Sequence, residues 1–264
     1  MGAFVQVVYG DYGDEKVTST SKIGGLPVGA RMALPDGRLF AHSRVGTTAL
    51  VAGKLYGGKA GEANTIFIKN VSLAATGAIG ATTLSLTMAG TALGANVYDG
   101  GYLITASSIG TGIGYLYKVK TAATAASTEN STVQLEPNDK LKVAVGGGTT
   151  TVGMRKNEYD SVLLTTADTV GVNTLAGVAC ATAAASAYVW LQRRGPAAVF
   201  GDNSTLIVGT PVIASSSVAG AVATFATASA DTAGVRYARN MKLVGVVMSV
   251  AASAEFSMID LQLE

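Results

Sequence analysis

Apolar residues alternate with polar residues at every second position in several parts of this chain, and this alternation constrains the fold most. Leu84, Leu86 and Met88 are separated by serine and threonine. Residues 141–145 and 259–264 alternate in a similar way. Because successive side chains of a β-strand point to opposite faces, the pattern is typical of half-buried strands in antiparallel sheets. A sustained 3.6-residue period, which an amphipathic helix needs, is hard to find, so we predict an all-β fold.

Turn-forming sequences separate the alternating runs, and such spacing predicts an antiparallel sandwich or a barrel-like body. Two alanine-rich stretches have helix-forming composition. We interpret residues 121–127 as a loop or hairpin, whereas residues 178–188 could form a helix or lead into the β-favouring cluster at 188–191. The turn sequences are Pro35-Asp36-Gly37, Tyr98-Asp99-Gly100-Gly101, Pro137-Asn138-Asp139, Gly146-Gly147-Gly148, Gly201-Asp202-Asn203 and Thr210-Pro211.

The distribution of residue types divides the chain into three parts. Residues 1–35 contain few large apolar side chains after Tyr12, and we expect them to form an extended amino-terminal arm that reaches a partner. Residues 36–192 are predicted to form the β-rich body. Residues 193–264 contain short strand patterns separated by single glycines. They are predicted to form a carboxy-terminal β-hairpin region, either separate from the body or part of the same domain.

Charged residues are scarce in this chain. They make up 14% of it, against about a quarter in ordinary soluble domains, and the net charge is +2. The 19 basic residues form no block, so the positive surface of a nucleic-acid-binding protein is not expected. The most apolar window, residues 177–191, is shorter than the roughly 20 residues of a membrane helix, and the amino terminus lacks the basic start of a signal peptide. We therefore expect a soluble protein, made in the cytoplasm, that binds neither nucleic acid nor a membrane.

Residue types that often carry catalysis occur singly. His42 is the only histidine and lies in an alternating segment, residues 40–44, in a chain without a nucleophile motif. Cys180 is the only cysteine, which excludes a disulfide within the chain, and no basic residue flanks it to lower its pKa. We interpret His42 as an ordinary strand residue and Cys180 as a small buried apolar residue. We predict no catalytic residue and no enzymatic activity.

Three short patterns approach known ligand motifs without completing them. Residues 53–60 nearly match a phosphate-binding loop, but Ala60 stands where a hydroxyl residue would bind magnesium, and a strand pattern follows. Residues 110–114 lack the rest of a dinucleotide fingerprint and are interpreted as a hairpin bend. The acidic residues within 11–15 do not have the spacing of a calcium loop. No cofactor and no metal site is predicted.

Six residues are candidates for contact with a protein partner. Tryptophan, tyrosine and arginine are the residue types most enriched among the anchors of protein interfaces. A tryptophan followed by two arginines in a charge-poor chain favours a subunit contact over a site for nucleic acid or sugar. The candidates are Tyr9, Tyr12 and Arg31 in the arm and Trp190, Arg193 and Arg194 further along the chain.

Several segments resemble structural proteins of tailed bacteriophages. They are similar to capsid-associated proteins of aquatic phages, of the decoration or cement type, over most of the chain from about residue 34. This resemblance implies a β-rich, often trimeric protein that binds the outer surface of an icosahedral shell where capsid subunits meet. The segments are residues 34–40, 49–55, 98–103, 110–115 and 190–195 and the final strand series ending at 261–263.

One function is expected, and two alternatives stay open. We expect a virion structural protein that decorates the phage head and stabilises it through many non-covalent contacts. Its partners would be the major capsid protein and further copies of this chain, as a homotrimer, on the outer capsid surface. One alternative is a tail-tube or fibre subunit. The other is a host-surface or carbohydrate-binding virion protein that uses the region of Trp190 and Arg193.

Overall fold

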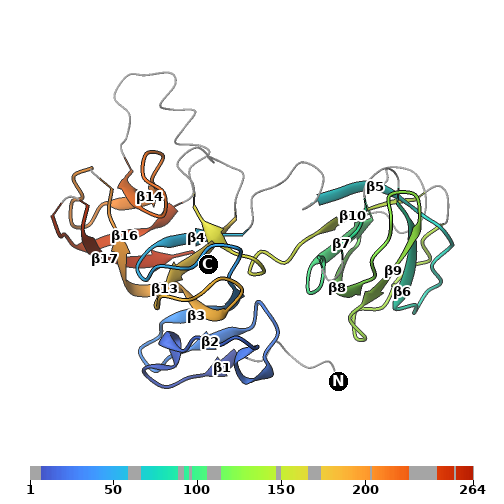
Figure 1. Ribbon diagram of the computed structural model, residues 1–264, viewed down its shortest axis with the longest axis horizontal. Helices are drawn as coiled ribbons and strands as arrows, with labels where there is room; N and C mark the ends of the chain where they lie inside the picture. The colour runs from blue at the N-terminus through green and yellow to red at the C-terminus, as the bar shows by residue number, and fades with distance from the viewer. Residues whose placement is uncertain are drawn as a thin grey trace. The chain divides into compact units, whose positions relative to one another are not determined.

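The regular secondary structure of the described residues is almost entirely β-strand, with two short 3₁₀ turns, η1 (Asp14–Lys16) and η2 (Ile23–Gly25) (Figure 1). The all-β prediction is therefore confirmed. Among the residues that the structure describes, no helix is long and apolar enough to cross a membrane. This computed structural model describes residues 7–58, 67–88, 92–94, 97–105, 114–146, 150–165, 174–202, 204–225, 243–252 and 254–263.

Two compact units divide the chain. We call Gly61–Asn157 the barrel unit, and Ala3–Ala60 together with Glu158–Glu264 the sheet unit. These boundaries differ from the predicted divisions after residues 35 and 192. The barrel unit lies wholly within residues 36–192, and the division after residue 192 falls inside one continuous strand of the sheet unit. Local sequence patterns could not show this, because the units are defined by pairing between distant segments.

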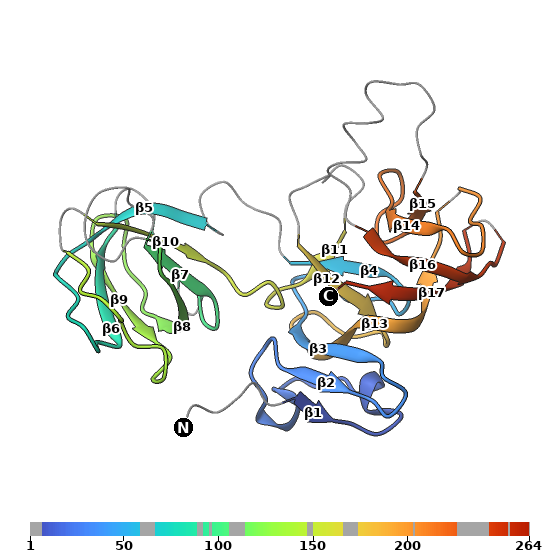
Figure 2. The same cartoon turned by 180° about the vertical axis from the view of Figure 1, so that it is seen from behind.

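The barrel unit is a closed barrel of six antiparallel strands (Figure 2). The strands are β5 (Phe67–Leu73), β6 (Thr83–Thr87), β7 (Tyr102–Thr105), β8 (Leu116–Ala122), β9 (Asn130–Leu135) and β10 (Thr151–Arg155). Their order around the barrel is β10-β5-β6-β9-β8-β7, so β6 pairs with β9 and not with β7, which follows it in sequence. Inward side chains such as Leu86, Leu103 and Val133 are fully buried and fill the core.

The alternation in two segments of the barrel unit has different outcomes. In β6 the alternate residues Leu84 and Leu86 are buried, as a half-buried strand requires. Residues 141–145 also place Leu141 and Val145 in the barrel core. They form a bend and one isolated bridge instead of a strand. The alternation there predicted the burial of Leu141 and Val145 correctly, but Val143 is only partly buried and the predicted strand is absent. Irregular backbone can also send separated residues inward.

The sheet unit contains one eleven-stranded sheet. Its strands are β1 (Val7–Tyr9), β2 (Arg31–Ala33), β3 (Leu39–Arg44), β4 (Leu55–Gly57), β11 (Leu163–Leu164), β12 (Leu175–Ala179), β13 (Tyr188–Phe200), β14 (Pro211–Ala214), β15 (Val222–Thr224), β16 (Leu243–Ser249) and β17 (Phe256–Gln262). The main path runs β1-β2-β3-β13-β17-β16-β14-β15, and β12 joins β13 to β4, which pairs with β11. The 13-residue strand β13 is central: its first half pairs with β3 and its second half with β17. The described pairs between these named strands are antiparallel except β1 with β2.

The barrel unit is an insertion in the sheet unit. The chain leaves the sheet unit after β4 and returns to it before β11. These two strands pair directly, with Gly57 opposite Leu163 and Tyr56 opposite Leu164. The sheet-unit strands that flank the insertion therefore pair in one ladder, although they are far apart in sequence.

Residues 7–34 do not extend from the sheet as an arm, because β1 and β2 continue the sheet beyond β3. β2 pairs with β3, and Met32 and Leu34 are buried in a cluster with side chains of β3 and β13. Glu15 in η1 is also buried, and its carboxylate accepts a hydrogen bond from the Gly13 N–H at 2.7 Å. A few apolar residues are enough for this packing, because they contact Phe40 of β3 and Trp190 of β13. The composition of residues 1–35 alone does not reveal these partners.

Neither alanine-rich stretch contains a helix. Residues 121–127 cover the end of β8 and the connection to β9, as predicted. Residues 178–188 cover the end of β12, a connection and the first residue of β13. The β-favouring cluster at 188–191 therefore decided the structure there, and the helical alternative is excluded.

Candidate functional site

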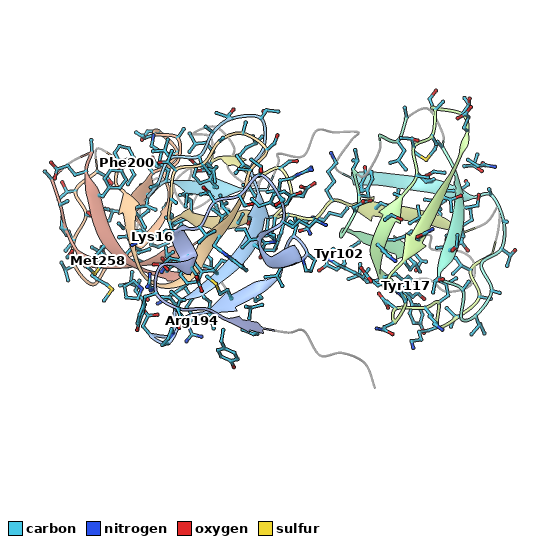
Figure 3. All side chains as sticks on the ribbon, turned by 60° about the horizontal axis from the view of Figure 1, so that its bottom comes forward. Lys16, Tyr102, Tyr117, Arg194, Phe200 and Met258 are labelled. Atoms are coloured by element: carbon cyan, nitrogen blue, oxygen red, sulfur yellow. The ribbon has the colours of Figure 1, made fainter. Side chains whose placement is uncertain are left out.

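The sheet around β17 exposes apolar side chains on its outer side. Phe256 and Met258 of β17 are 49% and 46% exposed, whereas the residues between and beyond them, Ser257 and Ile259, are buried. Met248, at a bulge of the neighbouring strand β16, is 45% exposed. Figure 3 labels Phe200 and Met258 on this part of the sheet unit. We call this surface the apolar face, and its members are Pro196, Ala198, Phe200, Met248, Phe256 and Met258.

The turn before β4 supports one edge of the apolar face. The rings of Phe200 and Phe256 pack with their centroids 5.4 Å apart. The Phe256 ring lies on Gly53, where an added Cβ atom would come within 2.5 Å of the ring. Gly53 also has a φ of +75°, a conformation that glycine adopts at low cost. Lys54 places its Nζ atom 5.1 Å from the centroid of the Phe200 ring, so a cation borders this edge.

Polar side chains border the other end of the apolar face. In the ladder between β13 and β17, Pro196 is opposite Asp260, and Arg194 is opposite Gln262. Arg194 and Gln262 are both exposed. An apolar centre with a polar rim is the usual composition of a protein–protein interface. The apolar face therefore has the arrangement of a surface that binds another protein.

The predicted partner-contact residues do not lie together. Tyr9 in β1 is 86% exposed and Tyr12, just after it, is 65% exposed. Arg31 in β2 is partly buried. β1 is separated from β17 by β2, β3 and β13, so the two tyrosines are not part of the apolar face. Arg194 is the one predicted residue that borders it (Figure 3).

Trp190 and Arg193 are buried, which corrects the expectation that they face a partner. Trp190 is 3% exposed and packs with Met32, Leu34 and Phe40. Arg193 is 7% exposed. The reason is that the first half of β13 is covered on both sides, so its residues are buried whichever way they point. A sequence pattern does not reveal such double coverage.

Arg193 connects three segments inside the sheet unit. Its guanidinium donates hydrogen bonds to the carbonyl oxygens of Leu175 at 3.1 Å, of Ala176 at 2.9 Å, and of Leu263. It also lies over the Tyr159 ring, 5.4 Å from the ring centroid. Burial raises the pKa of Tyr159 to about 12, so the phenol beside the guanidinium stays neutral. Arg193 therefore stabilises the interior of the sheet unit.

Of the two reactive residue types that occur once, His42 is buried, whereas Cys180, which was predicted to be buried, is only partly buried. His42 lies in β3, as predicted, and its side chain is fully buried. Burial lowers the pKa of His42 and raises the pKa of the Cys180 thiol to about 12. At neutral pH the histidine is therefore neutral and the cysteine is a thiol, the weakly nucleophilic form.

The incomplete ligand motifs form no ligand site within the described residues. Residues 53–58 make a turn and β4 instead of the start of a helix, and residues 59–60 lie outside the described residues, as do 110–113. The Asp14 carboxylate accepts a hydrogen bond from the Asp11 N–H at 2.9 Å, within an exposed turn. Among the described side chains, no group of three or more His, Cys, Asp or Glu residues could hold a metal ion.

A small cavity of about 110 Å³ lies beside Asp202 in the sheet unit. The Asp202 carboxylate accepts hydrogen bonds from the N–H of Ser204 at 2.7 Å, from the hydroxyl of Ser204, and from the hydroxyl of Ser215 at 2.7 Å. Both carboxylate oxygens are therefore engaged by the protein itself. We assign this group a structural role, because it joins the segment after β13 to the segment after β14.

Sequence reasoning missed the apolar face, although a signal for it is present. In β17 the inward residues Ile259 and Leu261 were predicted correctly. The outward residues Phe256 and Met258 are also apolar, so this strand is apolar on both faces at its start. A strand that is apolar on both faces is either covered by its own chain or available to a partner.

No protein family, curated protein or solved structure was found to match this chain. Its function must therefore be inferred from its own residues.

Proposed function

We propose that this chain is a structural protein of a virion, attached to the outer surface of a phage head by non-covalent contact. The observation that carries this proposal is the apolar face of the sheet unit. Contiguous apolar side chains that stay exposed on a folded chain are typical of surfaces that another protein covers. The resemblance to phage capsid-associated proteins points to the major capsid protein as the partner.

The apolar face supplies a modest free energy of binding per copy. Burying a whole phenylalanine or methionine side chain contributes about 1.5–3 kcal/mol. Because Met248, Phe256 and Met258 are each about half exposed, covering all three contributes about 2–4 kcal/mol. Association itself costs about 4 kcal/mol or more in lost freedom of motion. A single copy would therefore bind weakly.

A symmetric shell turns such weak contacts into stable attachment. When copies of the chain bind as one oligomer, the first contact holds the others at a high effective concentration next to their sites. A protein that binds the assembled shell and not its separate subunits also shifts the equilibrium toward the shell. The low content of charged residues, 14%, supports this role, because an uncharged surface loses little solvation energy when it is covered.

Electron microscopy of labelled particles tests the proposal. A small tag on this chain would be decorated with gold on virions purified from the cells that produce it. We expect label in a regular array over the head. Label confined to the tail would contradict the proposal and favour the tail-tube or fibre subunit. Particles without label would exclude a virion component.

The carbohydrate-binding alternative gains no support from the arrangement of its residues. It requires an exposed aromatic ring at Trp190 on which a sugar could stack, with Arg193 beside it. Both side chains are buried in the sheet unit. A glycan could reach them only if the residues that cover β13 moved away.

A further inference from the structure

His42 occupies an unusual position for a titratable side chain. It is fully buried in β3, with the Tyr188 ring stacked on one side, centroids 5.6 Å apart, and the Trp190 ring 5.2 Å away. Its Nδ1 atom lies 3.1 Å from the carbonyl oxygen of Pro27, which assigns the proton to Nδ1. Its Nε2 atom is buried without a hydrogen-bond partner. Protonation would therefore add a buried N–H donor at Nε2 and a positive charge, a cost that the backbone carbonyls of Pro27 and Leu26 offset only in part.

Residues 19–30 cover this histidine, and we call them the covering segment. One end is held by Ser19, which exchanges two backbone hydrogen bonds with Tyr188, at 3.0 and 2.7 Å. The other end is held at His42 itself, whose carbonyl accepts from the Gly29 N–H at 2.7 Å and whose N–H donates to the Ala30 carbonyl at 2.8 Å. The covering segment therefore lies across β3 and β13 with His42 directly beneath it.

The charges around His42 disfavour the protonated form. Lys22 of the covering segment is the charged side chain that acts on it, and it does so as a like charge. β13 contributes the Tyr188 phenol. Arg44, two positions along β3, is paired with Asp160 at 2.6 Å. Arg31 of β2 acts on Tyr159 instead. Among the described residues, no carboxylate acts on His42 as a counter-ion.

We propose that acid releases the covering segment from β3 and β13, because His42 takes up a proton more readily when that segment has moved away and water can reach the ring. The neutral imidazole thus keeps residues 19–30 closed, and Trp190 and Phe40 stay buried beneath them. Release would expose this second apolar cluster of the sheet unit. The inference is independent of the proposed attachment to a phage head.

The direction of the pH dependence follows from proton linkage. Burial, opposed by hydrogen bonds to the Pro27 and Leu26 backbone and helped by the charge of Lys22, holds the pKa of His42 below its ordinary value of 6.5 in the closed form. In the open form the pKa returns toward that value, so the open form binds more protons. Closure is complete above pH 6.5 and weakens as the pH falls below it. The opening equilibrium constant should rise by up to about tenfold for each pH unit, until the closed form is protonated as well.

Hydrogen exchange of the full chain measures this opening. The reporters are the backbone N–H groups of Gly29 and His42, and the reference is the N–H of Val247, which donates to the Thr210 carbonyl elsewhere in the sheet. Between about pH 8 and about pH 5, after correction for the intrinsic exchange rate, we expect at least a tenfold rise in opening at the two reporters and little change at the reference. Trp190 emission should shift to longer wavelength over the same range.

Two kinds of variant distinguish a titration of His42 from general acid instability. His42→Phe keeps an aromatic ring and His42→Gln keeps a donor for Pro27, and neither titrates, so each should remove the response. Lys22→Glu places a carboxylate on the covering segment, so it should reduce the response at least threefold. Equal opening of the wild-type reporters at both pH values would overturn the proposal. An unchanged pH response of the reporters in His42→Gln would also overturn the proposal. This variant keeps the test decisive even if His42→Phe does not fold.

Discussion

Replacing Arg193 with methionine should destabilise the sheet unit by several kcal/mol. The change removes a charged donor from the carbonyl oxygens of Leu175, Ala176 and Leu263 and leaves a flexible apolar side chain in its place. It also removes the cation that lies over the Tyr159 ring. Both losses fall in the interior, where water replaces a missing donor poorly.

The size of the effect follows from these contacts. Hydrogen bonds that involve a charged group contribute about 1.5–3 kcal/mol each, and a partly buried cation–π contact adds about 1 kcal/mol. Part of this is offset, because methionine does not carry the cost of burying a guanidinium. We therefore expect the free energy of unfolding to fall by about 2–5 kcal/mol.

Urea denaturation followed by the fluorescence of Trp190, the only tryptophan, measures this change. Arg194→Met is the matched control, because Arg194 is the next residue in β13 and is exposed. We expect the control to unfold within about 0.5 kcal/mol of the wild type. Equal stability of the two variants would refute the assignment of Arg193 to the interior and restore it as a partner-contact residue.

Two further substitution and labelling experiments test other parts of the structure. Gly53→Ala should lower the free energy of unfolding by about 1–3 kcal/mol, because alanine is strained at positive φ and its Cβ atom would displace the Phe256 ring. An unchanged unfolding midpoint would contradict this packing. Since burial raises the pKa of Cys180 to about 12, a thiol reagent at about pH 8 should label the folded chain at least 100-fold more slowly than the urea-unfolded chain. Equal labelling rates would show that the thiol is accessible and ionised.

Local alternation predicted the fold class and several buried residues. In β6 and β17 the burial of Leu84, Leu86, Ile259 and Leu261 follows from a period of two residues, because each of these strands has one face toward a core. This information is contained in consecutive residues, so the sequence alone is enough. The same reasoning predicted His42 as a strand residue in β3.

Features that depend on distant pairing could not be predicted in this way. The insertion of the barrel unit rests on the pairing of β4 with β11, and the packing of residues 7–34 rests on the surface made by β3 and β13. Burial of Trp190 and Arg193 likewise requires a strand covered on both sides. In each case the deciding partner lies far away in the sequence.

For the apolar face, the sequence predicts which way the side chains point but not what covers them. Phe256 and Met258 alternate with inward residues exactly as polar side chains would, so alternation places them outside but does not say what covers them. A resemblance to phage proteins suggests a partner without indicating the surface that binds it. Only the ladder between β13 and β17 brings these residues beside Phe200 and Ala198.

Binding of the purified protein to phage heads from which it has been removed tests the central claim most directly. Met258→Lys places a charge at the centre of the apolar face, and Ile79→Lys, at a 70% exposed apolar position of the barrel unit, is the matched control. We predict that the wild type and the Ile79→Lys variant bind intact heads equally well and that neither binds the dissociated capsid subunits. The Met258→Lys variant should bind heads at least about tenfold more weakly, a loss of about 1.4 kcal/mol in binding free energy. Equal binding of all three proteins, or no binding of the wild type to heads, would contradict attachment through the apolar face.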